Sequence, residues 1–582
     1  MLNRFLPRES FTSYEDFLEN YQINVPEHFN FATDVVDAWA KEDPDKAALV
    51  WCNDEGDERR LSFGDISLES ARAAAAFSRM GIKKGDAVML LLKRRWQFWI
   101  YAPALMRLGA IYIPATIQLT KKDIIYRCAA ASVCAVFSIT EKDISEAAAQ
   151  GVPECPDVRI AGFVRSDPKA EASEPVFIPE EGWIDLNEQI ALISDEEAKA
   201  FRDIRPEAGG EDPMLLYFTS GTTGMPKMVL HDFNHPLGHI VTAHYWQQLG
   251  PDDLHISVAD TGWAKCGWGK IYGQWICGAA NFVYDMDRFD SARLMEKLSY
   301  YKVTTFCAPP TIYRFMIQED LSGYDLSSLR LALTAGEPLN AEVFNRFKKA
   351  TGLAILEGFG QTEGSVLCAS FPWDAPRPGS MGKPSPLYKL DIIDDNNESC
   401  PPGTEGRVVV TGLNDGRPVG LFSGYYRDPA ATGRVWHDGI YETGDVAWRD
   451  EDGFYWYVGR SDDVIKCSGY RIGPFEVESA LQTHMAVLEC AITAAPDPIR
   501  GQVVKATIVL ARGYSPSDAL VKELQNHVKH TTAPYKYPRI IEFVDALPKT
   551  TSGKIRRVEI RGKDGTKEEK KDEKNFLNKD ET

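Results

Sequence analysis

Residues 217–227 read Tyr217-Phe-Thr-Ser-Gly-Thr-Thr-Gly-Met-Pro-Lys227 and join an apolar strand to a glycine-rich loop. The apolar run 214–218 predicts a buried strand, which leads into Gly, Ser and Thr residues and ends at a lysine. Hydroxyl groups, exposed backbone amides and an ammonium suit phosphate oxygens. The segment is not a Walker A loop, because Pro226 and Met228 stand where that pattern needs Gly before the Lys and Ser or Thr after it. The segment therefore predicts a phosphate-binding loop. The alternative is a glycine-rich loop that binds no ligand.

Apolar strands and helices alternate on both sides of this loop. Such β-α-β alternation predicts parallel sheets with covering helices. A proline suits the first turn of a helix, so we expect a helix from Pro236. Asn340 suits the N-cap of a helix that ends near Gly352. The other expected helices are 69–77 and 95–108, and the expected strands are 87–92, 111–114, 214–218, 304–308 and 331–334.

The length and composition of the chain limit its class. It has 582 residues, which is too long for one ordinary hydrophobic core and predicts two or more domains. Apolar residues make up 44% and charged residues 26% of it, which excludes a wholly disordered, collagenous or mucin-like chain. The net charge is -19, whereas a nucleic-acid binder would show a basic footprint. We therefore expect no nucleic-acid partner.

The sequence predicts neither a signal peptide nor a membrane-spanning helix. Its first residues, MLNRFLPRES, lack the apolar region of a signal peptide. No stretch approaches about 18 uninterrupted apolar residues, so no membrane-spanning helix is expected. The 11 cysteines are dispersed and form no CxxC pair, which favours reduced, buried thiols over a zinc site or disulfides. These features predict a cytoplasmic location.

The texture of the sequence changes along the chain. Residues 166–200 are acidic and weakly patterned, which predicts a surface insertion. From 380 to 459, short strands are separated by Asp, Asn, Gly and Pro turns, as in a small antiparallel barrel or sandwich. A segment with its own strands and helices follows Arg460. The expected parts are therefore a large domain at 1–460, a small α+β domain at 461–562 and a charged, disordered tail at 563–582.

Four more motifs follow the phosphate loop, and each alone also fits a solvated loop. Glu357-Gly-Phe-Gly-Gln-Thr-Glu-Gly364 does not fit the dinucleotide pattern GxGxxG, but Glu363 is a candidate Mg²⁺ ligand, since Mg²⁺ prefers one or two carboxylates plus phosphate oxygens. Tyr441-Glu-Thr-Gly-Asp445 precedes Arg460; a carboxylate suits two ribose hydroxyls, and a guanidinium can support it. The remaining two are Ser461-Asp-Asp-Val-Ile-Lys-Cys-Ser-Gly-Tyr-Arg-Ile-Gly-Pro474 and Pro548-Lys-Thr-Thr-Ser-Gly-Lys554.

In this order, the five motifs closely resemble those of the adenylate-forming superfamily, which contains acyl-CoA synthetases, luciferases and peptide-synthetase adenylation domains. The resemblance covers about residues 30 to 560 and is greatest with the medium-chain acyl-CoA synthetases. It implies an α/β fold: a large N-terminal domain of two stacked α/β sheets plus a small β-barrel, and a small mobile α+β C-terminal domain. The closer markers are Asp260-Thr-Gly-Trp263, Phe422-Ser-Gly-Tyr425, Ser468-Gly-Tyr-Arg-Ile-Gly-Pro474 and Ala533-Pro-Tyr-Lys-Tyr-Pro-Arg539.

The resemblance also implies a ligase reaction in two halves. A carboxylate attacks the α-phosphate of ATP and expels pyrophosphate, and the thiol of CoA then displaces AMP from the acyl-adenylate. Catalysis of this kind needs charge neutralisation rather than an enzyme nucleophile. In the family, Lys554 contacts the carboxylate and the α-phosphate, Thr362 touches the α-phosphate, and Glu363 holds Mg²⁺. The implied cofactors are ATP, Mg²⁺ and CoA.

The implied nucleotide site combines the phosphate loop with later segments. In the family, the loop holds the β- and γ-phosphates, Phe359 matches the aromatic that stacks on adenine, and Asp445 takes the ribose hydroxyls. The residues that match the family's ATP and AMP contacts are Thr219, Ser220, Gly221, Thr222, Thr223, Gly224, Met225, Pro226, Lys227, Gly336, Glu337, Pro338, Glu357, Gly358, Phe359, Gly360, Gln361, Asp445 and Arg460.

For the second half-reaction the family rotates its small domain about a hinge, and Asp462 occupies the hinge position. The resemblance implies that rotation removes Lys554 and brings in the hairpin 468–474 to line a pantetheine tunnel, with Arg471 near the substrate. The residues that match CoA contacts are Gln118, Ser468, Gly469, Tyr470, Arg500, Lys529, Tyr537, Pro538 and Arg539.

The resemblance places the acyl group between two walls. In acetate-preferring relatives a tryptophan follows the Mg²⁺ glutamate, and Gly364 stands in its place here, so we expect an acid larger than acetate. The segment with Trp263, Lys265 and Trp268 is expected to line the other wall. A medium-chain, branched or cyclic acid is the preferred substrate. A ligase for acetate, propionate or butyrate is the alternative.

Two other functions compete with this one. An acyl-AMP ligase would load a carrier protein, but Arg500 and the segment 533–539 favour CoA, because a carrier needs no basic groups for a nucleotide 3′-phosphate. A regulatory protein that only binds AMP is disfavoured by the presence of Lys554, Glu363 and Asp445.

Two clusters are interpreted as structural. His231, His235 and His239 are spaced like a metal-binding helix face, but Pro236 should begin the helix, so we expect surface or loop histidines that share no face. An aromatic stripe is expected to serve core packing and a dimer surface rather than nucleic-acid stacking, which leaves a monomer and a homodimer open. The stripe consists of Trp96, Phe98, Trp99 and Tyr101.

Overall fold

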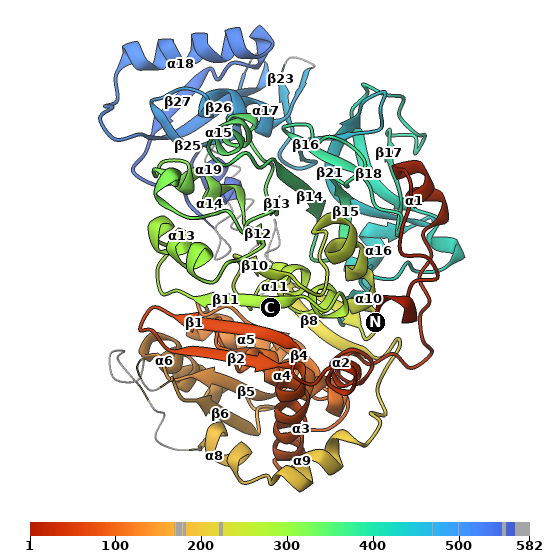
Figure 1. Cartoon of the computed structure of the whole chain (residues 1–582). Coiled ribbons are helices and arrows are strands. Elements are labelled where there is room, and N and C mark those ends of the chain that lie inside the picture. Colours follow the sequence, from red (N-terminus) through yellow and green to blue (C-terminus); the bar gives the residue numbers. More distant parts are fainter. Residues whose placement is uncertain are drawn as a thin grey trace.

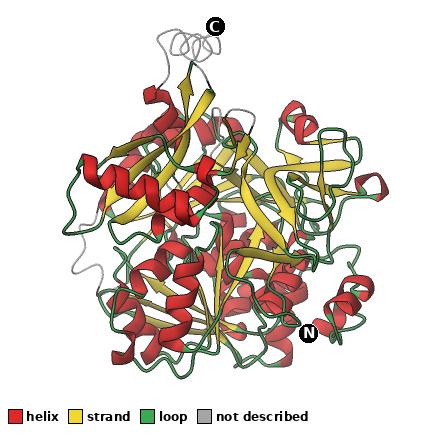
Figure 2. Ribbon diagram, turned by 90° about the horizontal axis from the view of Figure 1, so that it is seen from above, coloured by secondary structure: helices red, strands yellow, loops and turns green. Residues whose placement is uncertain are grey.

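The computed structural model contains three β-sheets, with 14, 8 and 5 strands, and helices cover them (Figure 1). Figure 2 gives the view from above, in which helices pack along the strands. The structure describes residues 1–582 except 168, 170–176, 178–181, 220–224, 468–469, 499, 550–554 and 565–582. In this described part of the chain, no helix is long and apolar enough to cross a membrane.

The largest sheet has parallel strands at its centre. Its strand order is β17-β18-β21-β22-β16-β15-β14-β13-β12-β10-β11-β1-β2. The short apolar runs in its middle are buried on both faces, as expected of parallel strands under helices. Its parallel strands are β1 (Ala47–Asn53), β10 (Leu254–Ser257), β11 (Ala280–Asp285), β12 (Thr305–Cys307), β13 (Leu331–Ala335) and β14 (Ile355–Gly360), and β2 (Glu58–Ser62) is antiparallel at one edge.

Antiparallel strands occupy the region 380–459, as predicted, and they continue the largest sheet. β15 (Val366–Ala369) pairs with β14, and β16 (Ser380–Pro384) pairs with both β15 and β22 (Tyr455–Arg460). The reversal of direction at β15 therefore begins one strand before the predicted region. The other strands here are β17 (Lys389–Ile393), β18 (Gly406–Thr411), β20 (Trp436–His437) and β21 (Ile440–Arg449).

The second sheet contains the phosphate loop, which connects β8 (Pro213–Thr219) with its antiparallel neighbour β9 (Lys227–Asp232). Its order is β19-β9-β8-β4-β3-β5-β6-β7, and β8 pairs with β4 in parallel. The predicted strands of this region are confirmed within one or two residues. The remaining strands are β3 (Ala87–Leu91), β4 (Ile111–Pro114), β5 (Val133–Ile139), β6 (Ile160–Val164), β7 (Trp183–Asp185) and β19 (Gly424–Tyr425).

Both sheets share one hydrophobic core, which includes Leu49 of β1, Met89 of β3 and Leu333 of β13. The two stacked α/β sheets are thus confirmed. Helices α3 (Phe63–Arg79) and α4 (Phe98–Leu108) belong to this core. The other helices of this part are α1 (Tyr14–Asn20), α2 (Ala38–Glu42), α5 (Lys121–Ala131), α6 (Lys142–Gly151), α8 (Leu186–Ala191), α9 (Asp195–Arg202), α10 (His235–Ile240), α11 (Ala264–Lys270), α12 (Tyr272–Ile276), α13 (Ser291–Tyr300), α14 (Pro310–Met316), α15 (Ala341–Thr351) and α16 (Pro429–Val435).

The five-stranded sheet and its helices, from β23 to α19, form what we call the C-terminal unit. β25 (Val487–Asp497) and β26 (Gly501–Leu510) are its long antiparallel pair, and β27 (Ile540–Phe543) pairs with β26 in parallel. The unit has its own buried core and the predicted α+β character. Its other elements are β23 (Ile465–Cys467), β24 (Tyr470–Ile472), α17 (Pro474–Gln482), α18 (Asp518–Thr531) and α19 (Arg557–Asp564).

The helix ends follow the local sequence, with two corrections. Asn340 caps α15 as predicted, and Gly352 ends it in the left-handed conformation. α10 begins at His235 instead of Pro236, because proline fits any position of the first helical turn. α4 begins at Phe98 rather than at residue 95, since Arg95 lies in the preceding turn, where its guanidinium bonds to a carboxylate of Glu141 at 2.6 Å.

The segment 166–200 is more than a surface insertion. β7 adds a strand to the second sheet, and α9 packs against α3, with Ala198 buried beside Ala75 and Ala76. The weak pattern hid these elements because each buries only a narrow apolar stripe beneath a charged face. The central residues 170–176 and 178–181 lie outside the described part. The charged tail beyond residue 564 does too, so its predicted disorder is not addressed.

The aromatic stripe belongs to the core. Phe98, Trp99 and Tyr101 are at most 2% exposed, and Trp96 is half-buried. The indole N–H of Trp99 donates to the Lys270 carbonyl at 2.7 Å, so α4 is covered by its own chain. The prediction of a dimer surface at these residues is therefore wrong for the three that are buried, while the prediction of core packing is confirmed. All 11 cysteines are free and buried, as predicted.

A buried ion pair between α4 and the segment before α2 provides a test of the packing. Arg107 donates to Asp37 through Nη1 at 2.8 Å and through Nη2 at 2.5 Å, and the Arg107 side chain is 2% exposed. Asp37→Ala would leave a buried guanidinium without its counter-charge, which costs about 3–5 kcal/mol. We expect a clear fall in the thermal unfolding midpoint and in the free energy of unfolding.

The control is Asp415→Ala, which removes the exposed pair between Lys389 and Asp415, whose atoms are 3.4 Å apart. That variant should change the free energy of unfolding by less than about 0.5 kcal/mol. An equally small effect of Asp37→Ala would mean that the Arg107 charge does not need the carboxylate.

Candidate active site

The phosphate loop is closed by paired residues. Thr219 ends β8 and pairs with Lys227, which begins β9. This pairing fixes the lysine at the base of the loop, where its Nζ lies 4.7 Å from the centre of the Tyr425 ring. Of the other predicted loop residues, Met225 is exposed, Pro226 is half-buried, and Ser220, Gly221, Thr222, Thr223 and Gly224 lie outside the described residues.

The segment that ends β14 is held from the antiparallel strands. The Tyr441 hydroxyl donates to Oε1 of Gln361 at 2.7 Å, and Nε2 of Gln361 donates to the Thr443 carbonyl at 2.8 Å. The ring of Phe359, predicted to stack on adenine, is half-buried, and its centre lies 6.3 Å from that of Tyr457. The segment is thus fixed before any nucleotide binds. Gly358 and Gly360 complete it within β14.

Thr362 and Glu363 are anchored through backbone and side chain. His231 donates from Nε2 to the Thr362 carbonyl at 2.8 Å, because that oxygen can only accept. The Phe422 N–H donates to the Glu363 carbonyl at 2.7 Å. The Tyr425 hydroxyl donates to Oε1 of Glu363 at 3.0 Å. Together these bonds fix the carboxylate that was predicted to bind Mg²⁺.

Asp445 and Arg460 face each other across β21 and β22, as the predicted ribose site requires. Nη1 of Arg460 lies 3.4 Å from Oδ1 of Asp445, and the Tyr457 hydroxyl donates to the same oxygen at 3.3 Å. Burial opposes the charge of Arg460, but the Asp445 carboxylate favours it, and the pKa of Arg460 is raised overall. Gly444 has a φ of 74°, and a Cβ there would lie 2.6 Å from the guanidinium. The positive φ therefore favours glycine here, and a larger residue would also displace the guanidinium.

The segment 336–338 follows β13 directly. Gly336 has a φ of 95°, which turns the chain, and Lys265 donates to the carbonyl of the residue before it. Oε2 of Glu337 lies 3.7 Å from Nη2 of Arg314. Lys265 belongs to the predicted acyl wall, and it bonds the residue that precedes the predicted adenine segment. The two parts of the site are therefore in contact.

Glu357 is a buried carboxyl group beneath this segment. It accepts a hydrogen bond at Oε1 from the backbone N–H of Leu339, which follows Pro338, at 3.3 Å. The residue is 5% exposed, and Oε2 is buried without a hydrogen-bond partner. Burial raises the pKa of Glu357 to about 8, although the Leu339 bond lowers it in part. Glu357 thus supports the backbone of the predicted adenine segment.

The three histidines are in the interior, so the prediction of surface or loop histidines is wrong. His231, His235 and His239 are 1%, 3% and 0% exposed. His235 and His239 lie one turn apart on α10, with their Nε2 atoms 3.1 Å apart, and the His231 ring centre lies 3.8 Å from that of His235. His235 and His239 share a face of α10 because His235 is its first residue, and His231 reaches them from β9.

Burial lowers the pKa of His231 and of His239 to about 3, and it lowers that of His235 well below the usual value. All three imidazoles are therefore neutral at physiological pH and can exchange hydrogen bonds with one another. Among the described residues, no group of three His, Cys, Asp or Glu side chains is arranged to hold a metal ion.

The two predicted acyl walls differ in the space beside them. A Cβ on Gly360 would lie 2.0 Å from the Trp268 ring, so this indole fills the volume next to β14. A Cβ on Gly364 would meet its nearest neighbours, Leu367 and the Tyr388 hydroxyl, only at 3.7 Å. Trp263 is half-buried at the start of α11. The wall at Trp268 is therefore closed, whereas a Cβ at Gly364 would make only ordinary van der Waals contacts.

Most of the predicted CoA residues gather on the C-terminal unit. Nζ of Lys529 lies 4.2 Å and the guanidinium carbon of Arg539 lies 4.8 Å from the centre of the Tyr537 ring. Tyr470 is exposed and stacks on Tyr535, with ring centres 4.3 Å apart. Arg500 precedes Gly501, which pairs with Cys467 at the end of β23, and Pro538 is buried. Ser468 and Gly469 lie outside the described residues, and Gln118 is exposed in the large part of the molecule, on the segment after β4.

The predicted hinge and its neighbours lie between β22 and β23. Asp462 is exposed, and so is Arg471 of β24. Asp463, the residue after the predicted hinge, forms ion pairs with Arg557 and Arg561 of α19. Lys554 lies outside the described residues, so its predicted contact with substrate stays a prediction.

Sequence reasoning missed the residues that hold the site together. Tyr441, Tyr425, Tyr457 and His231 all bond to predicted site residues, yet none was assigned a role. Two of them stood inside quoted motifs, since Tyr441 begins the motif of Asp445 and Tyr425 ends Phe422-Ser-Gly-Tyr425. The position of a tyrosine within such a motif was the available signal.

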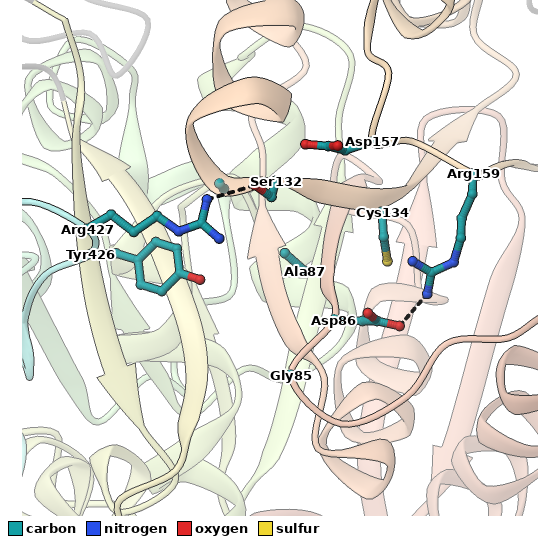
Figure 3. Close-up of a pocket in the computed structure, with 10 residues that line it drawn as sticks. Gly85, Asp86, Ala87, Ser132, Cys134, Asp157, Arg159, Tyr426 and Arg427 are labelled. Atoms are coloured by element: carbon teal, nitrogen blue, oxygen red, sulfur yellow. Dashed lines mark hydrogen bonds and ion pairs between the residues drawn. The ribbon is translucent and has the colours of Figure 1, made fainter.

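A pocket of about 310 Å³ lies elsewhere, at the amino ends of β3 and β5 (Figure 3). Asp86 and Arg159 form an ion pair in it, and Arg427 donates to the Ser132 hydroxyl at 2.7 Å. In the figure the Tyr426 ring lies beside Arg427. None of the predicted site residues lines this pocket, so it is separate from the candidate active site.

Comparison with known proteins identifies the family. The family of AMP-binding enzymes matches residues 36–426, and the C-terminal domain of AMP-binding enzymes matches residues 476–554. The chain belongs to the AMP-binding enzyme family. It is a ligase of the adenylate-forming type, as predicted.

Curated relatives are acyl-CoA synthetases. The mitochondrial acyl-coenzyme A synthetase ACSM3 of Mus musculus is 40% identical, with 96% of this chain and 94% of that protein covered. ACSM4 of Homo sapiens is 42% identical over 92% of this chain and 91% of its own length. These relatives confirm the prediction of an AMP-forming acyl-CoA synthetase, which uses ATP and CoA.

Solved structures confirm the fold. The anthranilate CoA ligase AuaEII, in complex with anthranoyl-AMP, has a TM-score of 0.82 and 28% identity, with 93% of this chain and 98% of that chain covered. The acyl-CoA synthetase of Brucella canis has a TM-score of 0.71 and 29% identity, with 95% and 99% covered.

Glu357 gives the site a measurable pH dependence. Its pKa is raised in the folded protein from 4.5 to about 8, so the native state holds a proton that the unfolded chain releases in this range. The stabilisation from this group is complete below about pH 4.5 and is lost as the pH rises through about 8. Relative to the wild type, Glu357→Gln should therefore gain up to roughly 1.4 kcal/mol per pH unit between these values. Thermal unfolding of both proteins at pH 5, 6.5 and 8 measures the difference; parallel curves would mean that Glu357 is ionised.

Proposed function

We propose that the described site activates a carboxylic acid by adenylation, with the residues matched above in their family roles. The supporting observation is the bond from His231 to the Thr362 carbonyl, because His231 lies on the strand that begins at Lys227. One rigid strand thus links the base of the phosphate loop to the residue proposed for the α-phosphate. A single triphosphate can then contact both.

Each side of the nucleotide has a proposed partner. Asp445, supported by Arg460 and Tyr457, takes the ribose hydroxyls, and Phe359 packs on the adenine. Lys227 and the loop amides neutralise the terminal phosphates. Lys554 neutralises the carboxylate and the α-phosphate as they approach each other. Donors of this kind lower the barrier because two anions must meet in one place.

Mg²⁺ is part of this proposal. Glu363 supplies one fixed carboxylate, and the described residues offer no cluster of three acidic or imidazole ligands nearby. A single carboxylate fits Mg²⁺, which is commonly held by one or two carboxylates together with substrate phosphates and water. When bound, the ion would supply charge neutralisation at the phosphates, and Glu363 would hold it.

The acid is proposed to be of medium size, branched or cyclic. The Trp268 indole fills the space beside Gly360, which opposes a long chain on that side. On the side of Gly364, a Cβ would make only ordinary van der Waals contacts, with Leu367, Tyr388 and Leu421. A compact acid directed toward Gly364 therefore fits better than a straight long chain. Acetate, propionate and butyrate are the alternative substrates.

The second half-reaction is proposed to use the C-terminal unit. The cations Lys529 and Arg539 on the Tyr537 ring suit the phosphates of CoA, and the hairpin at Tyr470 suits its pantetheine arm. We keep the division into domains at 1–460 and 461–562, with Asp462 as the hinge and Gln118 and Arg471 as contacts formed after rotation. Loading of a carrier protein is the competing reaction.

Location and assembly are also proposals. The buried, unpaired cysteines suit a reducing compartment such as the cytoplasm, whereas the curated relatives are named mitochondrial. Imaging of a tagged protein decides between these compartments. We also propose a homodimer, whose interface does not include the buried aromatic stripe. Light scattering of the protein in solution measures its mass and so distinguishes a dimer from a monomer.

The reaction is tested by pyrophosphate release across short, medium, branched and aromatic acids, with and without CoA. The proposal expects acid-dependent release that CoA accelerates. If no acid supports release, the protein only binds AMP. If release occurs but CoA accepts no acyl group, the carrier-protein reaction replaces it.

Lys554→Ala should separate the two half-reactions. The lysine is proposed to act only during adenylation, so acid-dependent pyrophosphate release should fall by about 10²–10³-fold, the typical effect of one electrostatic donor. Thioester formation from supplied acyl-AMP and CoA should stay near the wild-type rate. Equal losses in both assays would contradict the role of Lys554.

Gly364→Trp should shorten the range of acids. An indole there would occupy the volume proposed for the acyl group, and each buried methylene contributes about 0.8 kcal/mol of transfer free energy. The variant should therefore lose at least about 10²-fold in kcat/KM for hexanoate and benzoate, where roughly 1.4 kcal/mol is a factor of ten. Acetate should be nearly unaffected. A parallel loss for all acids would instead indicate a displaced Glu363.

A further inference from the structure

Tyr425 lies between two charged residues of the proposed nucleotide site. Its hydroxyl donates to Oε1 of Glu363 at 3.0 Å, while Nζ of Lys227 lies 4.7 Å from the centre of its ring. The side chain is buried, with the residue 7% exposed. One aromatic ring therefore touches both the lysine of the phosphate loop and the carboxylate proposed for Mg²⁺.

The backbone around Tyr425 is bonded to Glu363 and to the strand that begins at Lys227. β19 pairs with β9, with Tyr425 opposite Val229, and the N–H of Tyr426 donates to the Met228 carbonyl at 2.7 Å. The N–H of Phe422 donates to the carbonyl of Glu363 at 2.7 Å. The segment 422–426 thus holds Tyr425 at a fixed distance from each charge.

The chemistry of the two contacts is complementary. The phenol hydroxyl donates its proton to the hydrogen bond with the Glu363 carboxylate, which can only accept. The ring face attracts the ammonium of Lys227 as a cation–π partner. An ammonium and a carboxylate would otherwise attract each other directly, and the attraction is strong where water is excluded.

We propose that Tyr425 is a positioning residue that keeps Lys227 and Glu363 apart and orients the Glu363 carboxylate for Mg²⁺. The inference rests on the proposed function, in which Lys227 contacts phosphate and Glu363 holds the ion. Without Tyr425, the two charges would pair and close the space that the metal–phosphate group needs. With it, Lys227 lies over the ring while Glu363 is held at the hydroxyl.

Two substitutions separate the hydroxyl from the ring. Tyr425→Phe removes only the donor to Glu363, whereas Tyr425→Leu also removes the ring face under Lys227. The matched control is Tyr426→Phe, since the neighbouring tyrosine faces the separate pocket beside Arg427 (Figure 3). Thermal unfolding of each variant checks that it is folded.

The measurement is calorimetric binding of a non-hydrolysable ATP analogue, with Mg²⁺ and with EDTA. Tyr425→Phe should weaken binding roughly tenfold with Mg²⁺ and hardly at all with EDTA, since a hydrogen bond to a charged group is lost. Tyr425→Leu should weaken both, and Tyr426→Phe neither.

The variant Glu363→Gln shows whether a failed test contradicts the role of Tyr425 or the proposed function on which that role rests. If this variant retains the full gain from Mg²⁺, Glu363 is not the metal ligand and the proposed function fails at that residue. If Glu363→Gln loses the gain but Tyr425→Phe keeps it, the inference about Tyr425 is overturned. If the proposed function and the inference are both correct, adding Tyr425→Phe to the Glu363→Gln variant should cause no further loss of ATP-analogue affinity in the presence of Mg²⁺.

Discussion

The site depends on hydrogen bonds that join the two large sheets at β9. His231 on this strand bonds the Thr362 carbonyl at 2.8 Å, and the segment paired with it bonds the Glu363 carbonyl through the Phe422 N–H at 2.7 Å. The phosphate loop ends in one sheet and the segment after β14 ends in the other. Without these bonds, the phosphate loop and the segment after β14 could move relative to each other. Their fixed spacing is the condition for every role proposed above.

The buried histidines at this junction, and Glu357 beneath the segment 336–338, are neutral. The histidines His231, His235 and His239 lose their charge because burial lowers each pKa, and Glu357 is held protonated to about pH 8. Uncharged polar groups can exchange hydrogen bonds in a dry interior at little cost, whereas isolated charges there would be expensive. The charged residues Asp445 and Arg460 instead lie opposite each other on adjacent strands.

The sequence was sufficient for the parallel strands and for the residues inside the motifs. Strands such as β4 are continuous apolar runs, and Asn340 and Gly352 mark their helix in the local chemistry. It could not place the histidines, because their burial depends on how α10 packs between distant segments. It also missed Tyr425, which bonds Glu363 from a distant part of the chain, and Tyr457, which bonds Asp445 from the neighbouring strand β22. Side-chain contacts of this kind cannot be predicted from the spacing of residues along the sequence.

The burial of every cysteine has a consequence for how the molecule's motions can be followed. Cys52 in β1, Cys266 in α11 and Cys490 in β25 lie in three different layers, each in a separate hydrophobic core, and burial raises the pKa of Cys52 to about 11 and that of Cys266 to about 12. A thiol reagent needs both access and the thiolate. Each sulfur would be alkylated only when its own layer opens, so the order of labelling under native conditions would map the breathing of the protein layer by layer.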